Sequence, residues 1–427
     1  MKLGVFLLLG CLAPWSRADW PDFRGPGCDG RAGAAAGTNR IGLPLRWSER
    51  ENVKWKTPIP HRGWSTPVIV GGQIWLTTAT LDGHDFFAVC AEAGAGTIIF
   101  DERVFHCDDP EPLGNDVNCY ASPSPVVEPG RAYVNFGSYG TACLDTATFK
   151  VLWRRDDLPC RHLCGPGSSP VLCGDMLILT MDGIEAQYVA GLDKKTGRTV
   201  WKTDRSAEWS KLGPGGGLLS GDLRKAYSTP LIIDVGGAKQ MLSIGARAAY
   251  SYDPFTGREL WKVRHEGYAP APRPLFDNGV AFLPTGFGRS ELLATRVNGH
   301  GDVTDTAIVW RAGKAQPQKP SAVLDGGLIF MVNDGGIASC LDEATGGEVW
   351  RERIGGEYSA SALCGDGRIY CFSQEGRTTV LKAGRVCEPL ATNQLANGFM
   401  ASAAVCGHAL ILRTKTDLYR IEESGTQ

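Results

Sequence analysis

The chain has 427 residues, a formal net charge of -2 at pH 7 and 21% charged residues. This near-neutral balance argues against a nucleic-acid or other polyanionic partner. No apolar run after the amino terminus is long enough to cross a bilayer as a helix. The 55 glycines and 12 tryptophans are typical of many short strands joined by tight turns.

Residues 1–18 have the features of an export signal, with an early lysine, an apolar run, and Ser16 and Ala18 as the small residues of a cleavage site. The alternative is a lipoprotein signal, in which Leu8-Leu9-Gly10-Cys11 would carry a lipid on Cys11. We therefore expect an exported protein, periplasmic or extracellular, with lipid anchoring at Cys11 as the second interpretation and no processing of this segment as the third.

Removal of Cys11 leaves an odd number of cysteines in a compartment that permits disulfides. Several of them recur at one place in a repeated unit, where cysteine acts as a small hydrophobic residue. These are Cys143, Cys173, Cys340, Cys364 and Cys406. Four others lie in irregular segments and are the candidates for disulfides, with a connectivity that the sequence does not specify: Cys107, Cys119, Cys160 and Cys164.

An arm poor in strand-forming residues follows at 19–51, and the segment Asn52–Thr57 then has the composition of an outer strand. Repeats begin after it, each opened by a small residue and a proline or its substitute. The openers are Thr66-Pro67, Ser124-Pro125, Ser169-Pro170, Thr229-Pro230, Arg273-Pro274, Ser321-Ala322, Ala360-Ser361 and Ser402-Ala403. Each opener precedes two short strands separated by a turn that often contains glycine.

The second half of the repeat is a hairpin with one sequence signature. In its copy at 192–201, Asp193 can accept hydrogen bonds from backbone amides, Thr196 supports the turn and Gly197 supplies a positive φ. Further copies lie at 252–261 and 341–350, with a degenerate copy at 144–153. Four short antiparallel strands at spacings of roughly 40–50 residues are the pattern of a β-propeller blade.

Eight openers predict an all-β, eight-bladed propeller of four-stranded antiparallel blades, spanning 52–423 and followed by a short tail at 424–427. The last blade has only three strands before the chain ends. We expect Asn52–Thr57 to pair beside Asp417–Ile421 as the missing fourth strand, because this closes the ring and leaves no open ring edge.

The repeated Ala/Leu-Asp-x-x-Thr-Gly-x-x-x-Trp hairpin resembles the repeat of pyrroloquinoline-quinone (PQQ-like) propellers, over nearly the whole mature chain. The arm Asp19-Trp20-Pro21-Asp22-Phe23-Arg24-Gly25-Pro26 is similar to the start of many exported bacterial members that lack an assigned activity. The resemblance implies that the repeat tryptophans dock one blade against the next. They are Trp153, Trp201, Trp261, Trp310 and Trp350.

The resemblance also covers quinone-dependent dehydrogenases and the propeller lipoprotein that helps to assemble outer-membrane barrels. The dehydrogenases carry a disulfide between adjacent cysteines over the quinone and bind Ca²⁺ through Glu, Asn and a catalytic Asp. No two cysteines are adjacent here, and no matching Glu-Asn-Asp set can be placed. We therefore expect no cofactor, with PQQ or Ca²⁺ as the alternative that no motif supports.

The long irregular segments nearly all connect one blade to the next, and they share one face of a propeller. They lie at 101–120, 154–167, 202–227 and 262–273. Long connections on a rigid scaffold are common places for function, so this crossover face is the predicted binding face. Its candidate residues are His61, His84, His106, Asp108, Asp109, Asp116, Asn118, Tyr120, Arg161, His162 and His265.

Five of the seven histidines fall on this face, and imidazole is the usual ligand of transition metals. His106 and His162 are the favoured pair for a metal or catalytic site, although long polar loops would collect histidines without one. The carboxylates of the loop at 106–120 do not have EF-hand spacing. No Gly-x-Ser-x-Gly, His-Glu-x-x-His or Cys-x-x-Cys motif is present.

These observations favour an exported, non-catalytic propeller, expected to be a monomer, that binds an extracytoplasmic protein or glycan through the crossover face. The alternative is an oxidoreductase of quinoprotein type, or a metal-dependent enzyme, centred on the funnel. A purely structural role in the envelope is the third interpretation. Fold alone does not decide between these functions.

Overall fold

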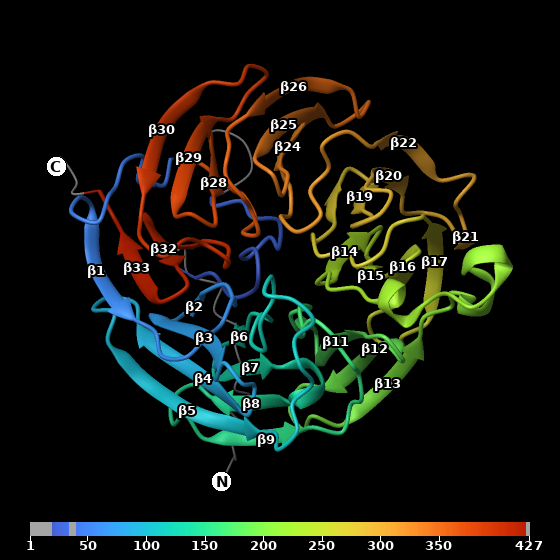
Figure 1. The fold of residues 1–427 in the computed structure, drawn as a ribbon, viewed down its shortest axis with the longest axis horizontal. Helices are drawn as coiled ribbons and strands as arrows, with labels where there is room; N and C mark the ends of the chain where they lie inside the picture. Colours follow the sequence, from blue (N-terminus) through green and yellow to red (C-terminus); the bar gives the residue numbers. More distant parts are fainter. Residues whose placement is uncertain (1–18, 34–39, 424–427) are drawn as a thin grey trace, which may run out of the picture.

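Eight sheets, each with four antiparallel blade strands, surround a central axis in the computed structural model, which describes residues 19–33 and 40–423 (Figure 1). Seven of these sheets have four strands, and the sheet of blade 4 has a fifth, parallel strand. The predicted eight-bladed propeller is confirmed. The predicted signal at 1–18 with Cys11, and the tail at 424–427, lie outside the described residues. Within the described ranges, no helix is long and apolar enough to be a membrane span.

The first four blades run in chain order from the axis outward. Blade 1 is β2 (Val68–Val70), β3 (Gln73–Ala79), β4 (Asp85–Glu92) and β5 (Ile98–His106). Blade 2 is β6 (Val126–Glu128), β7 (Arg131–Asn135), β8 (Thr141–Asp145) and β9 (Val151–Arg155). Blade 3 is β10 (Val171–Cys173), β11 (Met176–Asp182), β12 (Gln187–Asp193) and β13 (Thr199–Asp204). Blade 4 is β14 (Leu231–Val235), β15 (Ala238–Ile244), β16 (Ala248–Tyr252) and β17 (Glu259–Arg264).

The remaining blades repeat this order, except for the last. Blade 5 is β18 (Leu275–Asp277), β19 (Val280–Pro284), β20 (Leu292–Arg296) and β22 (Ile308–Ala312). Blade 6 is β23 (Val323–Asp325), β24 (Leu328–Val332), β25 (Ile337–Asp342) and β26 (Glu348–Arg353). Blade 7 is β27 (Leu363–Gly365), β28 (Arg368–Phe372), β29 (Arg377–Lys382) and β30 (Pro389–Gln394). Blade 8 is β31 (Ala404–Cys406), β32 (Ala409–Arg413), β33 (Asp417–Ile421) and β1 (Val53–Pro58).

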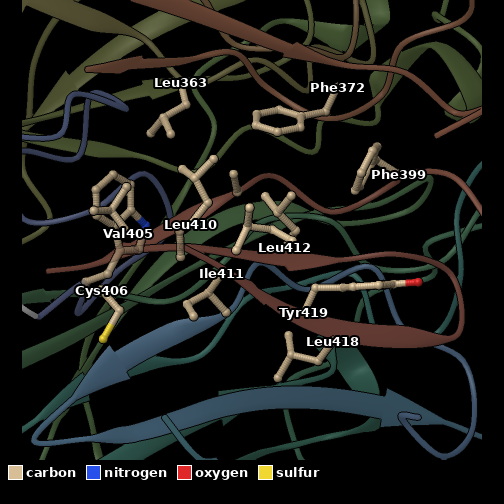
Figure 2. Close-up of a cluster of buried hydrophobic side chains, with 14 of the residues drawn as sticks. Leu363, Phe372, Phe399, Val405, Cys406, Leu410, Ile411, Leu412, Leu418 and Tyr419 are labelled. Carbon is tan, nitrogen blue, oxygen red and sulfur yellow. The ribbon is translucent and has the colours of Figure 1, made fainter. Parts of the chain in front are cut away.

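Blade 8 closes the ring as the sequence predicts. Strand β1 pairs antiparallel with β33, with Val53 opposite Ile421 and Pro58 opposite Asp417. The blade packs into a cluster of buried side chains, in which Leu410 and Leu412 of β32 lie near Phe372 and Phe399 (Figure 2). Because β1 and β33 belong to one sheet, the first and last strands of the described chain are joined in a single blade.

The repeated hairpin explains how neighbouring blades dock. In the turn after β12, the Asp193 carboxylate accepts from the Thr196 hydroxyl at 2.8 Å and from the Thr196 and Lys195 amides, and these bonds lower the pKa of Asp193. Gly197 has φ +72°, and a Cβ there would lie 2.6 Å from the Trp153 ring. Trp153, in the preceding blade, donates its indole N–H to the Lys194 carbonyl at 3.0 Å.

The same indole bond is made by five of the eight outer strands, each to the turn between the third and fourth strands (the third turn) of the next blade. The acceptors are the carbonyls of Ala93 for Trp55, Pro254 for Trp201, Glu343 for Trp310 and Gly384 for Trp350. Trp261 differs from the others and donates to Gln240 of its own blade. The third turn of blade 5 is longer, and it adds β21 (Gly301–Asp302) in parallel to the outer edge of β17.

The arm at 19–33 covers the end of the axis where the inner strands finish. Trp20 exchanges two backbone hydrogen bonds with Ile69 of β2, and Ala32 donates to Cys364 of β27. The arm, in dark blue, reaches the centre of the ring in Figure 1. Residues 40–51 continue along blades 7 and 8, where Trp47 is buried and stacks near Tyr370.

Candidate functional site

A cavity of about 610 Å³ opens around the axis on the crossover face. Each of the eight crossovers contributes at least one residue to its lining, as does the second turn of blade 5. A crossover is the segment that leads from the outer strand of one blade to the inner strand of the next. The eight crossovers are represented in the lining, in chain order, by Trp64, Asn118, Leu163, Tyr227, Tyr268, Lys319, Ser359 and Met400. The volume is that of sites that hold small molecules, so the ring encloses a funnel large enough for a ligand or a partner's side chains.

The upper walls of the funnel are largely aromatic and apolar. Tyr268 pairs through its backbone with Phe287, and their rings lie 6.3 Å apart. Trp64 faces the cavity from the first crossover, beside the guanidinium of Arg62 at 5.2 Å. Tyr227 adds a further ring, and burial raises the pKa of its hydroxyl. These walls suit an apolar or aromatic group better than a strongly hydrated one.

Two lysines line the funnel, and each has its own carboxylate. Lys225 is buried, forms an ion pair with Asp222, and places its Nζ 3.8 Å from the Cys164 thiol. Lys319 Nζ lies 3.4 Å from Asp334 Oδ1. Because both ammonium groups are paired, the walls contribute little net charge.

A ring of hydroxyl residues lies below the walls, formed by the repeat openers. The backbone N–H of one opener donates to the hydroxyl oxygen of the next, at 2.9 to 3.0 Å. We call the six accepting residues the hydroxyl ring: Ser124, Ser169, Thr229, Ser321, Ser361 and Ser402. All but Ser321 line the cavity.

This hydrogen-bonded series refines the expected register of the repeats and shows where it breaks. In blade 7 the equivalent residue is Ser361 rather than Ala360, because Ser361 accepts from Ser321 and donates to Ser402. Blade 5 has Arg273 in place of a hydroxyl residue. The Arg273 guanidinium donates to the Pro230 carbonyl at 2.8 Å and forms an ion pair with Asp22 at 3.0 Å.

The arm forms the floor of the funnel. Phe23 lines the cavity, and its carbonyl accepts from Arg273. Arg24 is buried and donates to the carbonyls of Ala362 at 2.5 Å and Ala322 at 2.7 Å. The arm therefore blocks the axial channel with three consecutive residues whose polar groups are bonded to blades 5, 6 and 7.

Neighbouring crossovers are hydrogen-bonded to one another at the mouth. The Asn118 amide donates to the carbonyls of Gly165 and Pro166, at 3.2 and 3.0 Å. The Glu111 carboxylate accepts from the His162 amide at 2.8 Å. Long loops held in this way can present a fixed surface to a partner.

The structure separates the favoured pair, His106 and His162, but brings His84 and His106 together, with ring centroids 6.2 Å apart. His106 ends β5, is exposed, and contacts Asp85 at 2.7 Å and Asp108 at 3.2 Å, which raises its pKa. His162 is buried, accepts from the Ser138 amide at 3.1 Å, and has its pKa lowered to about 4 by burial. In the described chain no group of three His, Cys, Asp or Glu residues is arranged to hold a metal ion.

The other predicted residues are distributed around the outside of the funnel, except Asn118, which lines it. His61 stacks on Phe87 at 4.1 Å, and His84 Nδ1 lies 2.7 Å from the Cys107 carbonyl oxygen. Tyr120 is buried and donates to the Glu111 carbonyl. His265 is buried, with its pKa lowered to about 3 chiefly by burial. Asp109, Asp116 and Arg161 are exposed.

The proposed disulfide cysteines do not pair in the structure. Cys107, Cys119, Cys160 and Cys164 are all free thiols, as are the other cysteines of the described segments. Cys119 is buried beside Ser122, Cys160 is buried near His162, and Cys164 lies at the cavity beside Lys225. Their irregular surroundings are loops packed by other contacts, and the disulfides expected from the sequence stay a prediction.

Sequence reasoning identified the openers as blade markers but missed that they line the axis. It also missed the aromatic walls and the arm as the floor. The recurring hydroxyl was the available signal, because a small hydroxyl residue precedes seven of the eight inner strands, and six of these seven residues line the same cavity. Phe23 and Arg273 had no such signal, since each occurs once.

The chain matches the family described as "Outer membrane protein assembly factor BamB" over residues 55–212, 185–299 and 246–385. Together these stretches cover more than half of the chain. No curated protein matches it.

Several solved structures share the fold at low sequence identity. BamB from Moraxella catarrhalis has a TM-score of 0.60 and 13% identity, covering 86% of this chain and 99% of its own. Quinohemoprotein alcohol dehydrogenase ADHIIG from Pseudomonas putida HK5 has a TM-score of 0.63 and 13% identity, and the match covers 96% of this chain and 81% of the dehydrogenase. A europium-containing methanol dehydrogenase has a TM-score of 0.59 and 11% identity, and the match covers 94% of this chain and 89% of that dehydrogenase. At these identities the likeness concerns the fold alone.

The residues of the funnel do not fit a quinone held by calcium. Ca²⁺ requires six to eight oxygen ligands, usually including several carboxylates. Asp222 is the one carboxylate residue of the lining, and it is paired with Lys225. The donor set therefore differs from the one that the dehydrogenase resemblance would require.

Proposed function

This chain belongs to the family described as outer membrane protein assembly factor BamB, and on that basis we propose that it is a non-catalytic binding propeller. It acts outside the cytoplasm, as its amino-terminal sequence suggests. Its partner is an extracytoplasmic protein or glycan that docks on the crossover face and inserts a group into the funnel.

The single observation that carries this proposal is the funnel itself, lined by all eight crossovers and floored by the arm. Its walls are aromatic and apolar, with a few polar groups, which is the composition of recognition sites. The charged side chains of its lining are paired, Lys225 with Asp222 and Lys319 with Asp334, and His106 lies outside the cavity. A funnel-centred oxidoreductase is the alternative, and the donor set gives it no support.

A pair of matched positions tests the proposal. Val117 lies at the funnel mouth with 48% of its surface exposed, and Phe255 lies in a third turn on the opposite face with 47% exposed. A photo-crosslinking amino acid is introduced at each position in cells that express the protein. We expect a discrete adduct from position 117 and none from position 255. Equal adducts from both positions, or none from 117, would contradict binding through the crossover face.

A further inference from the structure

We propose that the hydroxyl ring and the cationic floor form a receptor for a carboxylate, which is carried on an apolar or aromatic body that fills the funnel. This inference rests on the proposed function and specifies the chemistry of the group that is bound. The carboxylate could belong to a free organic acid or to the C-terminus of a peptide, and the test below separates these two sources.

The hydroxyl ring presents hydrogen-bond donors to the cavity. Each ring oxygen accepts one backbone N–H, so the hydroxyl hydrogen must find an acceptor elsewhere. Among the described residues, none of the six ring hydroxyls donates to a protein acceptor. Five of the six line the cavity, and their residues are more than nine-tenths buried, so these donors face one shared cavity. Such a set fits a group with several acceptor lone pairs.

Buried positive charge lies next to the ring. Arg24 donates to Ala322 and Ala362, each the direct successor of a ring residue, and Arg273 donates to Pro230, the successor of Thr229. Arg413 donates to Ser65, the residue before Thr66.

One buried carboxylate, Asp22, pairs with Arg273. Arg24 and Arg413 donate to carbonyl and hydroxyl oxygens and make no ion pair with any residue that the structure describes. Burial lowers the pKa of each to about 10, so both stay charged at neutral pH. Charges in a weakly screened interior favour an anion at the adjacent ring.

The walls determine what carries the carboxylate. Trp64, Tyr227, Tyr268 and Phe287 line the space above the ring, and both wall lysines are already paired. An inorganic anion would leave this apolar surface unfilled, whereas an acid with an aromatic body would bury it. The ligand therefore has an apolar end at the mouth and an acidic end at the floor.

The test compares matched acids and amides by calorimetry on the purified mature chain. The first pair is 3-phenylpropionate and 3-phenylpropionamide, which represents a free organic acid. The second pair is N-acetyl-Ala-Phe with a free or an amidated C-terminus, which represents a peptide end. We expect the acid to bind at least about tenfold more tightly than the amide in one of the two pairs, which identifies the source. If neither acid exceeds its amide, the proposal is overturned.

Ser361 and Ser321 provide a matched control. Each accepts the same type of backbone bond, at 2.9 Å, but Ser361 lines the cavity and Ser321 does not. Ser361→Ala should weaken the acid about tenfold and leave the amide unchanged, while Ser321→Ala should leave both unchanged. Ser124→Ala replaces Ser361→Ala if that variant does not fold. Equal losses from the cavity variant and Ser321→Ala would overturn the proposal.

The crosslinking experiment at Val117 keeps the two proposals separate. An adduct at position 117 together with equal binding of acids and amides would leave the binding function standing and remove only the carboxylate assignment.

Discussion

The two ends of the axial channel are built on the same inner strands, yet they are covered in opposite ways. At one end the crossovers lead into the openers and surround a cavity of about 610 Å³. At the other end short glycine turns and the arm leave the channel closed, with Asp22 and Arg273 paired beneath Phe23. The comparison teaches that the closed end determines the depth of the site and the open end determines what reaches it.

The largest expected effect comes from breaking the ring on which both ends depend. Removing all residues after Val405 deletes β32 and β33, so β1 loses the strand with which it pairs. We expect the truncated protein to lose its cooperative thermal unfolding transition, measured by circular dichroism, because an open ring exposes two sheet edges. A truncated protein with unchanged melting behaviour would refute closure through the ends.

Arg273→Ala tests the closed end. The substitution leaves Asp22 buried without its partner and removes two bonds to Pro230. We expect a loss of about 3–5 kcal/mol in the free energy of unfolding, measured in urea. The double variant Asp22→Asn/Arg273→Ala should lose less than this, because no buried charge is then left unpaired. A loss below about 1 kcal/mol in the single variant would show that the arm is not held by this pair.

The crossover face should be sensitive to acid. Burial lowers the pKa of His162 from 6.5 to about 4, so the unfolded chain binds this proton at a higher pH than the folded chain does. The contribution of His162 to the free energy of unfolding is therefore fully present above pH 6.5. As the pH falls toward 4, this contribution decreases by roughly 3 kcal/mol.

His106, on the same face, has the opposite pH dependence, because its pKa is raised rather than lowered. Its hydrogen bond to Asp85 raises its pKa, so its contribution is present at low pH and is lost as the pH rises through that pKa. NMR titration of the imidazole signals should show His162 protonating well below His106. Protonation of His162 near pH 6.5 would contradict the buried, neutral state.

Two glycines on the closed-end face separate backbone strain from blade docking. Gly197→Ala places a Cβ 2.6 Å from Trp153 at φ +72°, whereas Gly236→Ala at φ +61° meets nothing within 4 Å. We expect a loss of about 1 kcal/mol for Gly236→Ala and about 2 kcal/mol or more for Gly197→Ala, measured in urea. Equal losses would mean that the Trp153 side chain moves to accommodate the methyl group at little energetic cost.

The smallest expected effect concerns the open end. Incubation with PQQ and Ca²⁺ should leave no quinone absorbance after gel filtration, because Asp222 is the one carboxylate residue in the lining and is already paired. A stoichiometric band that survives gel filtration, with dye reduction on an alcohol or sugar, would favour the oxidoreductase alternative.

The fold was predictable because its signals repeat. The Asp193-type turn and its tryptophan occur several times at one register, and the unpaired segment before the first repeat implied the closing strand that became β1. The site was predictable only to the level of a face. Asn118 lines the funnel, while His106 and His162 lie in separate environments, because loop packing decides which polar residues face the axis. Arg273 acts through a contact with Asp22, which lies about 250 positions away in the sequence. No local sequence pattern predicts a single contact of this kind.

The closed floor has a kinetic consequence. With Phe23 and Arg24 across the axis, a ligand must leave by the opening through which it entered. A loop change that only widens or narrows this opening therefore alters association and dissociation rates by the same factor and leaves Kd unchanged. Residence time can thus be adjusted at the rim independently of affinity, which is set by the contacts deeper in the funnel.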